Sequence, residues 1–258
     1  MKTIILAGGW GTRMGQHTEW IPKPMVNIGN RPMLWHIMKY YSHYGYNDFV
    51  ICAGVKAQVI KEYFFNFQMH SLDFSKDLSS GVVKFHNIDS LPDWKVTVAD
   101  TGLDTLKGGR IKRIEKHLTD ENNMVTYGDG LSDINIGKLV EFHRSHNKLV
   151  TISGVHPPAR FGEIAEIGGV VTNFSEKPQT SVGLINGGYM VFRRGLLDYL
   201  STDESCDLEF GALEQLSREG EVMVFKHSGI WECIDHDRDL VHLNQLWRTK
   251  SAFWKVWE

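Results

Sequence analysis

A glycine-rich segment near the start of the chain carries the residue types that chemistry on a phosphate group requires. It reads Leu6-Ala7-Gly8-Gly9-Trp10-Gly11-Thr12-Arg13 and follows an apolar run, which places it at the carboxyl end of a buried strand. Glycines allow backbone N–H groups to approach an anion closely, and Arg13 adds a planar cation that matches phosphate oxygens. The segment therefore predicts a phosphate-binding loop.

Two well-known phosphate loops do not fit this segment. A P-loop has Lys followed by Ser or Thr after its last glycine, and the segment has neither. The dinucleotide-binding loop needs a third glycine at position 14, which is Met14, and a helix directly afterwards, where Pro22 and Pro24 follow instead. The remaining alternative is an ordinary glycine-rich turn, and the arginine at its end argues against that.

Lys23 is the second candidate for chemistry on a phosphate. Pro24 disfavours helix at Lys23 and holds the backbone extended, so the ammonium group can be directed at a fixed point. A lysine provides a compact charge that suits a phosphate. Taken alone, Pro-Lys-Pro is typical of an exposed loop. Its nearness to the glycine-rich segment favours a functional role.

Together these motifs resemble the signature of the nucleotidylyltransferases that join a nucleoside triphosphate to a sugar 1-phosphate. The resemblance extends over nearly the whole chain and is greatest for the branch of the glucose-1-phosphate cytidylyltransferases. It implies cytidylyl transfer from CTP to a sugar 1-phosphate, with glucose 1-phosphate first, giving a CDP-sugar and pyrophosphate. Further segments that carry it are 34–39, 108–110, 127–130, 160–162, 176–178, 185–188 and 254–258.

The resemblance assigns a role to each group of candidate residues. It implies that Arg13 and Lys23 are catalytic, and that two more distant residues join the glycine-rich segment in binding the nucleotide. The implied nucleotide-binding set is Leu6, Ala7, Gly8, Gly9, Gly11, Thr12, Arg13, Arg110 and Gly128. The implied acceptor-binding set is Glu176, Lys177, Asn186 and Gly187.

Two aspartates are the expected ligands of a magnesium ion, Mg²⁺. Asp129 lies between two glycines directly after an apolar strand, and Asp235 follows the apolar stretch that ends at Ile234. Mg²⁺ in proteins favours one or two carboxylates together with phosphate oxygens and water. A single aspartate after a strand is more often a turn residue, so it is the resemblance that implies Asp129 and Asp235 as the metal-binding pair.

The acceptor end of the chain departs from the family pattern at His236, where the family usually has threonine. Glu232 and Asp237 are close to it in the sequence and would favour a charged imidazole if they faced it. One hypothesis is therefore a CTP-dependent enzyme with a different phosphorylated acceptor, and the other is that His236 packs behind the metal site. A non-catalytic nucleotide-binding module of the same fold is a third alternative.

Three further groups of residues have a structural interpretation. Residues 107–116 include five basic side chains and indicate a solvated helix face rather than a nucleic-acid patch. His143 and His146 lack a third ligand for zinc and indicate an exposed helix face. Cys233 has no neighbouring base and is expected to be a small buried residue, not a nucleophile.

The elements that position these residues follow from short apolar runs that alternate with segments of helical periodicity. The pattern predicts one α/β domain over 1–258, with a Rossmann-like, mixed but mainly parallel sheet, helices on both faces and a small antiparallel subregion. We expect the nucleotide-binding part at about 1–130 and the acceptor-binding and oligomer-contact part at about 131–258. Strands are predicted at 4–7, 49–53, 124–127, 149–153, 170–174, 189–192 and 222–225, and helices at 32–44 (with Asn30 as a possible N-cap), 56–67, 136–146 and 208–218.

Composition narrows the class of protein. The 258 residues include 28 Lys+Arg and 31 Asp+Glu, a net charge of −3, which argues against a dedicated nucleic-acid binder. Three distant cysteines form no disulfide framework, and no apolar stretch approaches the roughly 20 residues that span a bilayer. A cytoplasmic protein without a membrane partner is expected. Family members assemble, and several C-terminal tryptophans suit a subunit contact, so a homo-oligomer is expected as well.

Overall fold

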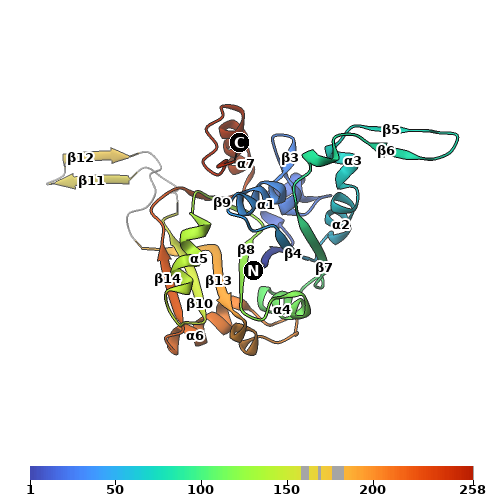
Figure 1. Cartoon of the computed structure of the whole chain (residues 1–258). Coiled ribbons are helices and arrows are strands. Elements are labelled where there is room, and N and C mark those ends of the chain that lie inside the picture. The colour runs from blue at the N-terminus through green and yellow to red at the C-terminus, as the bar shows by residue number, and fades with distance from the viewer. Residues whose placement is uncertain (158–162, 168–169, 176–182, 258) are drawn as a thin grey trace.

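In the computed structural model, a mixed sheet of seven strands forms the centre of the chain (Figure 1). The structure describes residues 1–157, 163–167, 170–175 and 183–257. Four neighbouring strand pairs are parallel and the two that involve β13 are antiparallel, which confirms the predicted mainly parallel α/β fold. In spatial order the strands are β14 (Val222–Lys226), β10 (Val150–Val155), β13 (Ile185–Arg193), β8 (Asn122–Tyr127), β1 (Thr3–Ala7), β4 (Asp48–Ala53) and β7 (Lys95–Asp100).

Each face of this sheet supports its own hydrophobic core. Successive side chains of a strand point to opposite faces, and accordingly Ile5 and Ala7 belong to one core while Ile4 belongs to the other. The first core is covered by α1 (Met33–His43), α2 (Ala57–Phe65), α5 (Ile136–Arg144) and α7 (Asp237–Arg248). The second is covered by α4 (Lys107–Arg113), η5 (Arg194–Tyr199), η6 (Leu208–Leu213) and α6 (Glu214–Arg218).

Smaller elements lie outside the central sheet. The hairpin of β5 (Phe74–Lys76) and β6 (Val83–Phe85) extends away from the body of the molecule beside the short helix α3 (Phe67–Ser71) (Figure 1). The pair of β9 and β15 joins chain segments about a hundred residues apart and matters for the site below. These elements are β2 (Asn27–Ile28), β3 (Arg31–Pro32), α3 (Phe67–Ser71), β5 (Phe74–Lys76), β6 (Val83–Phe85), β9 (Gly130–Ser132), β11 (Glu163–Ile167), β12 (Val170–Ser175), β15 (Trp231–Cys233), and the short helical turns η1 (Thr12–Thr18), η2 (Lys23–Met25), η3 (Ile88–Ser90) and η4 (Glu115–His117).

Two helix predictions need correction. Asn30 is not an N-cap, because it lies in the turn between β2 and β3, and Pro32 occupies the N-cap position of α1 without a side-chain hydrogen bond. The helix expected over 208–218 begins as a π-helical segment, and regular α-helix starts only at Glu214. The Asp207 carboxylate accepts from the N–H groups of Glu209 and Phe210, which fixes this start.

The C-terminal tryptophans pack within their own chain. Trp254 is fully buried, and its Nε1 donates to Nδ1 of His36 on α1 at 3.3 Å. The ring of Trp247 lies edge-on to the same imidazole, with 4.6 Å between ring centroids, and Trp257 lies against Trp35. These aromatic contacts hold the C-terminus to α1, and the use of the C-terminal tryptophans as a subunit contact stays a prediction.

His143 is buried, contrary to the exposed face expected for it. Its Nδ1 lies 2.8 Å from the hydroxyl of Thr151 on β10, and its Nε2 lies 3.3 Å from Oδ1 of Asn122. The helix α5 turns its Ile136 and Leu139 side toward the sheet, and His143 shares that side. Its two ring nitrogens are therefore used in packing, and among the described residues no group of three or more candidate ligands surrounds a metal position.

Two buried histidines predict that the free energy of unfolding falls as the pH drops below 6.5. Burial lowers the pKa of His36 to about 4, and burial together with His146 and Arg193 lowers the pKa of His143 to about 4. Because each pKa is near 6.5 in the unfolded chain, between about pH 4 and 6.5 the unfolded state binds more protons and stability is lost as the pH falls. We expect a loss of about 2 kcal/mol per histidine between pH 7.5 and pH 5, measured by urea unfolding.

Two substitutions on α1 test the source of this pH dependence. His36→Gln is expected to remove about half of it, because one of the two buried imidazoles is gone. His43→Gln changes an exposed imidazole on the same helix and is the matched control, with the pH dependence retained. Equal unfolding free energies for the unsubstituted protein at pH 7.5 and pH 5 would contradict the prediction.

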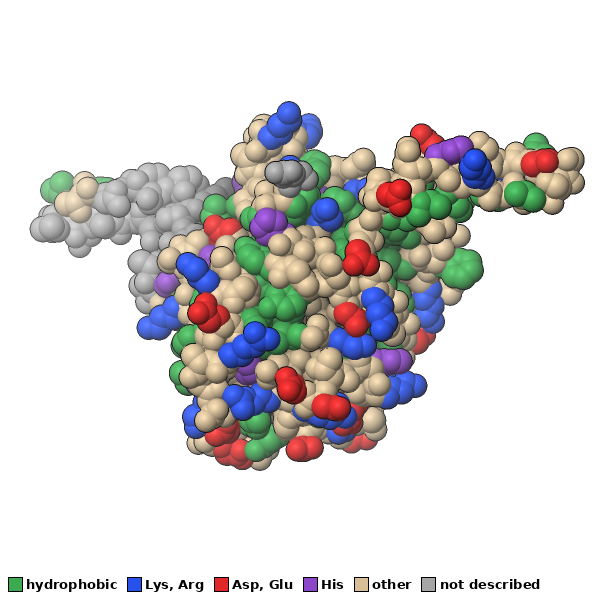
Figure 2. All heavy atoms as spheres, in the orientation of Figure 1, with side chains coloured by type: hydrophobic (Ala, Val, Ile, Leu, Met, Phe, Trp, Pro, Cys, Tyr) green, Lys and Arg blue, Asp and Glu red, His purple; other side chains and the backbone are tan. Residues whose placement is uncertain are grey.

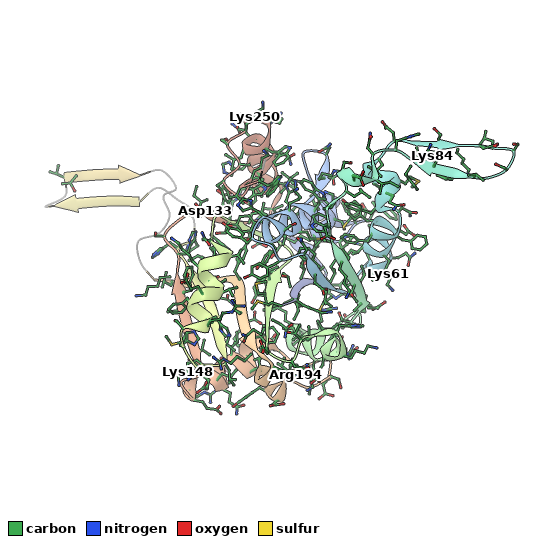
Figure 3. All side chains as sticks on the ribbon, in the orientation of Figure 1. Lys61, Lys84, Asp133, Lys148, Arg194 and Lys250 are labelled. Carbon is green, nitrogen blue, oxygen red and sulfur yellow. The ribbon has the colours of Figure 1, made fainter. Side chains whose placement is uncertain are left out.

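The surface carries both signs of charge. On the face that Figure 2 draws, Lys and Arg side chains are interspersed with Asp and Glu. Surface ion pairs such as Lys148 with Glu221 at 3.2 Å and Arg194 with Glu115 at 3.3 Å lie on the outside of the fold (Figure 3).

Within the described residues, the structure has no helix of the length and apolar character needed to cross a membrane.

Candidate active site

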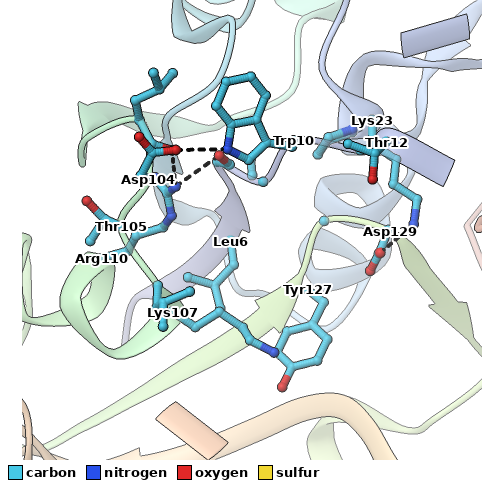
Figure 4. A pocket seen from close by; sticks show the side chains of 18 residues that line it. Leu6, Trp10, Thr12, Lys23, Asp104, Thr105, Lys107, Arg110, Tyr127 and Asp129 are labelled. Atoms are coloured by element: carbon cyan, nitrogen blue, oxygen red, sulfur yellow. Dashed lines mark hydrogen bonds and ion pairs between the residues drawn. The ribbon is translucent and has the colours of Figure 1, made fainter. Parts of the chain in front are cut away.

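A cavity of about 410 Å³ opens at the carboxyl ends of β1 and β8 (Figure 4). This volume is in the range of small-molecule sites, and this sheet edge is where open α/β folds bind ligands. It brings together most of the predicted site: Leu6, Ala7, Gly8, Gly9, Gly11, Thr12, Lys23, Arg110, Gly128 and Asp129 all line it. The side chain of Arg13 and the residues Glu176 and Lys177 lie outside the part of the chain that the structure describes.

Gly128 holds the two sides of this cavity together. Its N–H donates to the carbonyl oxygen of Leu6 at 3.0 Å, at the end of β1. A Cβ atom at this position would lie 2.7 Å both from that oxygen and from Cγ of Pro24. Because real Cβ atoms do not approach so closely, only glycine allows the turn that carries Lys23 to pack on the sheet edge.

Lys23 bridges the two predicted metal ligands. Its Nζ donates to Oδ2 of Asp129 at 2.8 Å and to Oδ1 of Asp235 at 2.7 Å. The lysine side chain is only 12% exposed. Burial opposes the ammonium charge, but the two carboxylates outweigh burial and raise the pKa of Lys23 above its ordinary value. Three residues from separate parts of the sequence thus converge on one charged centre.

The pair of β9 and β15 brings Asp235 to this centre. Gly130 lies opposite Cys233 in the antiparallel register, and the N–H of Ile234 donates to the carbonyl oxygen of Asp129 at 2.9 Å. The backbone of Asp235 is held in turn, because its N–H donates to the Asp239 carboxylate at 2.9 Å. The position of Asp235 therefore depends on strand pairing between residues about a hundred positions apart.

Cys233 is partly buried beside the two aspartates, less than the sequence predicted. Burial together with Asp235 and Asp129 raises the pKa of its thiol to about 12. It is therefore protonated at neutral pH, and a protonated thiol is a poor nucleophile.

The two aspartates fit a divalent metal ion. Their oxygens Oδ2 and Oδ1 both lie within 3 Å of one atom, Nζ of Lys23, so they converge on a single cationic position. Within the described residues no third carboxylate, histidine or cysteine joins them. Two carboxylates are the usual protein share of a Mg²⁺ site in which phosphate oxygens and water complete the coordination.

The opposite wall of the cavity was not predicted from the sequence. It consists of residues 103–107, which follow the end of β7. At the rim, Nε1 of Trp10 donates to Oδ1 of Asp104 at 3.0 Å, so the glycine-rich segment touches this wall directly (Figure 4). The available signal was the position of this loop at the carboxyl end of a parallel strand, the same edge as the glycine-rich segment.

A polar network closes the end of the cavity near β13. Tyr127 and Lys107 both hydrogen-bond to Oε1 of Glu209, and the ammonium of Lys107 lies 4.7 Å from the ring centroid of Tyr127. Asn186, a predicted acceptor-binding residue, donates from Nδ2 to the Tyr127 hydroxyl at 3.1 Å. Its neighbour Gly187 accepts at its carbonyl from Nε1 of Trp231 at 2.7 Å. Asn186 is therefore oriented by Tyr127, which lines the cavity.

The imidazole of His236 faces a different partner from the one expected. His236 is the N-cap residue of α7. Its Nδ1 lies 3.6 Å from Oδ2 of Asp239, and its backbone N–H donates to the same carboxylate at 2.8 Å. Glu232, the expected neighbour, pairs instead with His242 at 3.3 Å. The reason is that α7 turns His242 toward β15. His236 thus has a structural role at the start of a helix.

Arg110 lines the cavity, but its guanidinium group is used by the protein. It is 4% exposed, and both of its Nη atoms donate to backbone or hydroxyl oxygens. The direct contact with a nucleotide that the family resemblance implies for Arg110 stays a prediction.

Known proteins share the sequence and the fold of this chain. A family model described as nucleotidyl transferase matches residues 2–248. The glucose-1-phosphate cytidylyltransferase of Salmonella typhimurium is 42% identical over 259 residues, with 100% of both chains covered. A Bacillus subtilis protein described as a probable glucose-1-phosphate cytidylyltransferase is 39% identical over 257 residues, again with 100% of both chains covered. The solved inositol-1-phosphate CTP transferase from T. maritima shares the fold, with a TM-score of 0.67 at 14% identity over 100% of this chain and 97% of that one.

Proposed function

Because the chain belongs to the nucleotidyl transferase family, we propose that it transfers the cytidylyl group of CTP to glucose 1-phosphate, giving CDP-glucose and pyrophosphate. The convergence of Lys23, Asp129 and Asp235 beside a glycine-rich loop is the structural observation that carries this proposal. Full-length identities of 42% and 39% with glucose-1-phosphate cytidylyltransferases support the choice of CTP and of glucose 1-phosphate.

The reaction requires little covalent participation by the protein. A phosphate oxygen of glucose 1-phosphate attacks the α-phosphorus of CTP, and a new P–O bond forms. The bond from that phosphorus to the bridging oxygen of the β-phosphate breaks, and pyrophosphate leaves with the electron pair. The work of the protein is to position the two phosphates and to stabilise their charge.

Each group of predicted site residues has a proposed task in the reaction. Backbone N–H groups of the glycine-rich segment and Arg13 hold the triphosphate, and Lys23 stabilises negative charge that develops at the α-phosphate. Glu176, Lys177, Asn186 and Gly187 receive the acceptor. Enzymes of this family generally use a divalent metal. We propose Mg²⁺, held by Asp129 and Asp235, which when bound supplies charge neutralisation for phosphate oxygens.

A pyrophosphate-release assay tests the proposed function. CTP, UTP, dTTP, ATP and GTP are each supplied with glucose 1-phosphate and Mg²⁺, and the CDP-glucose product is identified by mass spectrometry. We expect CTP to exceed each other nucleotide by at least about tenfold in kcat/KM. A different preferred nucleotide would contradict the proposal. CTP binding without turnover on any of several sugar phosphates would favour the non-catalytic alternative.

The hypothesis of a different phosphorylated acceptor predicts that His236 contributes to acceptor specificity, and this contribution can be measured. Threonine is also a good N-cap residue. The substitution His236→Thr is therefore expected to change kcat/KM for glucose 1-phosphate by less than about twofold. The same kinetics on a panel of other sugar 1-phosphates provide the comparison. If the substitution instead raised kcat/KM for glucose 1-phosphate tenfold, His236 would select a different acceptor and the proposed substrate would be wrong.

Three expectations from the sequence stay predictions. They are the assembly into a homo-oligomer, the location in the cytoplasm, and the division into a nucleotide-binding part at about 1–130 and an acceptor-binding part at about 131–258. The absence of a nucleic-acid partner likewise rests on the near-neutral charge balance of the sequence.

A further inference from the structure

Arg110 occupies an unusual place for a cation. Its side chain rises from α4 into the space beneath the glycine-rich loop, where it is 4% exposed. Among the described residues no carboxylate forms an ion pair with it, and burial lowers the pKa of the guanidinium below its ordinary value. A buried charge of this kind persists only when its hydrogen atoms are well satisfied.

Backbone carbonyls satisfy the guanidinium group. Nη1 donates to the carbonyl oxygen of Gly102 at 2.8 Å and to Oγ1 of Thr101 at 2.8 Å, and the carbonyl oxygen of Ala53 lies at 3.3 Å. Nη2 donates to the carbonyl oxygens of Gly8 at 2.9 Å and Leu103 at 3.1 Å. The two Nη atoms have four hydrogens, and five acceptors from three chain segments use them.

The surrounding backbone is shaped to this group. A Cβ atom at Gly8 would lie 2.2 Å from Nη1 of Arg110, and one at Gly54 would lie 2.3 Å from the same atom. Two glycines that are 46 positions apart in the sequence thus leave the room that the guanidinium fills. Gly54 does not line the cavity, so its small size serves the packing around Arg110 and not a ligand.

The contacts of Arg110 connect the two walls of the cavity. Gly8 belongs to the glycine-rich loop, and Leu103 belongs to the opposite wall, whose Asp104 meets Trp10 at the rim (Figure 4). Because a trans peptide is planar, the Gly8 carbonyl that points at Arg110 turns the N–H of Gly9 to the opposite side. The Gly8 carbonyl also accepts from the N–H of Val55 at 3.1 Å, so Arg110 and Val55 together hold the direction of that loop N–H, and Arg110 connects this carbonyl to Leu103 of the opposite wall.

We propose that Arg110 is a positioning residue, which preorganises the glycine-rich loop and residues 101–105, where the chain enters the opposite wall, for the nucleotide through the carbonyl oxygens of Gly8, Gly102 and Leu103. The proposal rests on the proposed function for the identity of the nucleotide. Preorganisation of a binding loop improves affinity because less ordering remains to be done on binding. Loss of Arg110 should thus weaken nucleotide binding and leave acceptor binding unchanged.

Arg110→Ala with guanidinium rescue tests this role, and Arg113→Ala is the matched control. Arg113 lies on the same helix and holds the same loop through the carbonyl of Thr101 and the hydroxyl of Thr105, but within the described part of the chain it makes no hydrogen bond to Gly8. We expect Arg110→Ala to raise KM for CTP at least tenfold, with kcat and KM for glucose 1-phosphate changed by less than threefold. Guanidinium chloride at millimolar concentration should restore the KM, and methylammonium chloride should not. Arg113→Ala should change the KM for CTP by less than threefold.

Hydrogen–deuterium exchange of the nucleotide-free protein separates positioning from direct contact. In Arg110→Ala, residues 8–12 and 101–106 are expected to exchange at least tenfold faster, with guanidinium reversing the effect. Unchanged exchange with a raised KM would mean that Arg110 acts only by touching the nucleotide, and would overturn the proposal. A lowered melting temperature with an unchanged KM would overturn it too, as a purely structural effect. If another nucleotide proves to be the substrate, the exchange result still decides the role of Arg110.

Discussion

Lys23→Ala is expected to lower kcat by a factor on the order of a hundred or more, with little change in KM for glucose 1-phosphate. The ammonium group is held by Asp129 at 2.8 Å and Asp235 at 2.7 Å, and Lys23 lines the cavity. A cation beside the α-phosphate stabilises the negative charge that develops there, and removing one such group typically costs this much. Steady-state kinetics measure the effect, and circular dichroism checks the fold.

Lys61→Ala is the matched control for this prediction. Lys61 also pairs with an aspartate, Asp100 at 3.3 Å, but it lies on the outside of α2 and β7, away from the cavity (Figure 3). Exposed pairs of this kind contribute little to stability or activity. We expect the kcat of Lys61→Ala to match that of the unsubstituted protein. Near-normal kcat for Lys23→Ala with an intact fold would remove Lys23 from the proposed mechanism.

The side of the cavity that the glycine-rich loop, Gly128 and Asp129 form could be predicted from the sequence because its determinants are local. The apolar run before Gly8 has no alternation, which indicates a strand buried on both faces, and β1 lies between β4 and β8 in the sheet. The loop at its end must then lie at the carboxyl edge. Gly128 and Asp129 follow β8 for the same reason, so they reach the same place.

The positions of Asp235 and Glu209 depend on contacts that no local pattern encodes. Asp235 reaches Asp129 only through the register of β9 with β15. Glu209 reaches Tyr127 because a π-helical segment, and not a regular helix, begins at Leu208. Neither the strand pairing nor the irregular turn has a sequence signal of its own, so both residues needed the structure or a family resemblance.

His143 is a case in which the sequence held the signal. Ile136, Leu139, Val140 and His143 follow the spacing i, i+3, i+4 and i+7, which defines the buried side of a helix. The residue type suggested exposure, and the spacing suggested burial. The hydroxyl of Thr151 decides the outcome, because it gives the buried imidazole a hydrogen-bond partner at 2.8 Å.

Asp129→Asn and Asp235→Asn test the proposed metal pair. An amide oxygen keeps the shape of the carboxylate but loses its charge, and a hard divalent cation binds the charged oxygen far better. We expect each variant to lower kcat by a factor on the order of 10² to 10³. Asp133→Asn is the matched control, since Asp133 lies a few residues beyond Asp129 and pairs with His227 at 2.7 Å outside the cavity. It should retain kcat within about threefold.

A binding measurement without turnover completes this test, because Lys23 and a metal ion use the same two carboxylates. Mn²⁺ titration followed by electron paramagnetic resonance, in the absence of nucleotide, reports the metal alone. The Lys23 ammonium and Mn²⁺ are both cations and compete for the same two carboxylates. Lys23→Ala is therefore expected to bind Mn²⁺ at least tenfold more tightly than the unsubstituted protein. Adding Asp235→Asn to Lys23→Ala should abolish that gain, while adding Asp133→Asn should preserve it. Equal Mn²⁺ affinity in all four proteins would place the metal elsewhere, whatever the activities of the single variants.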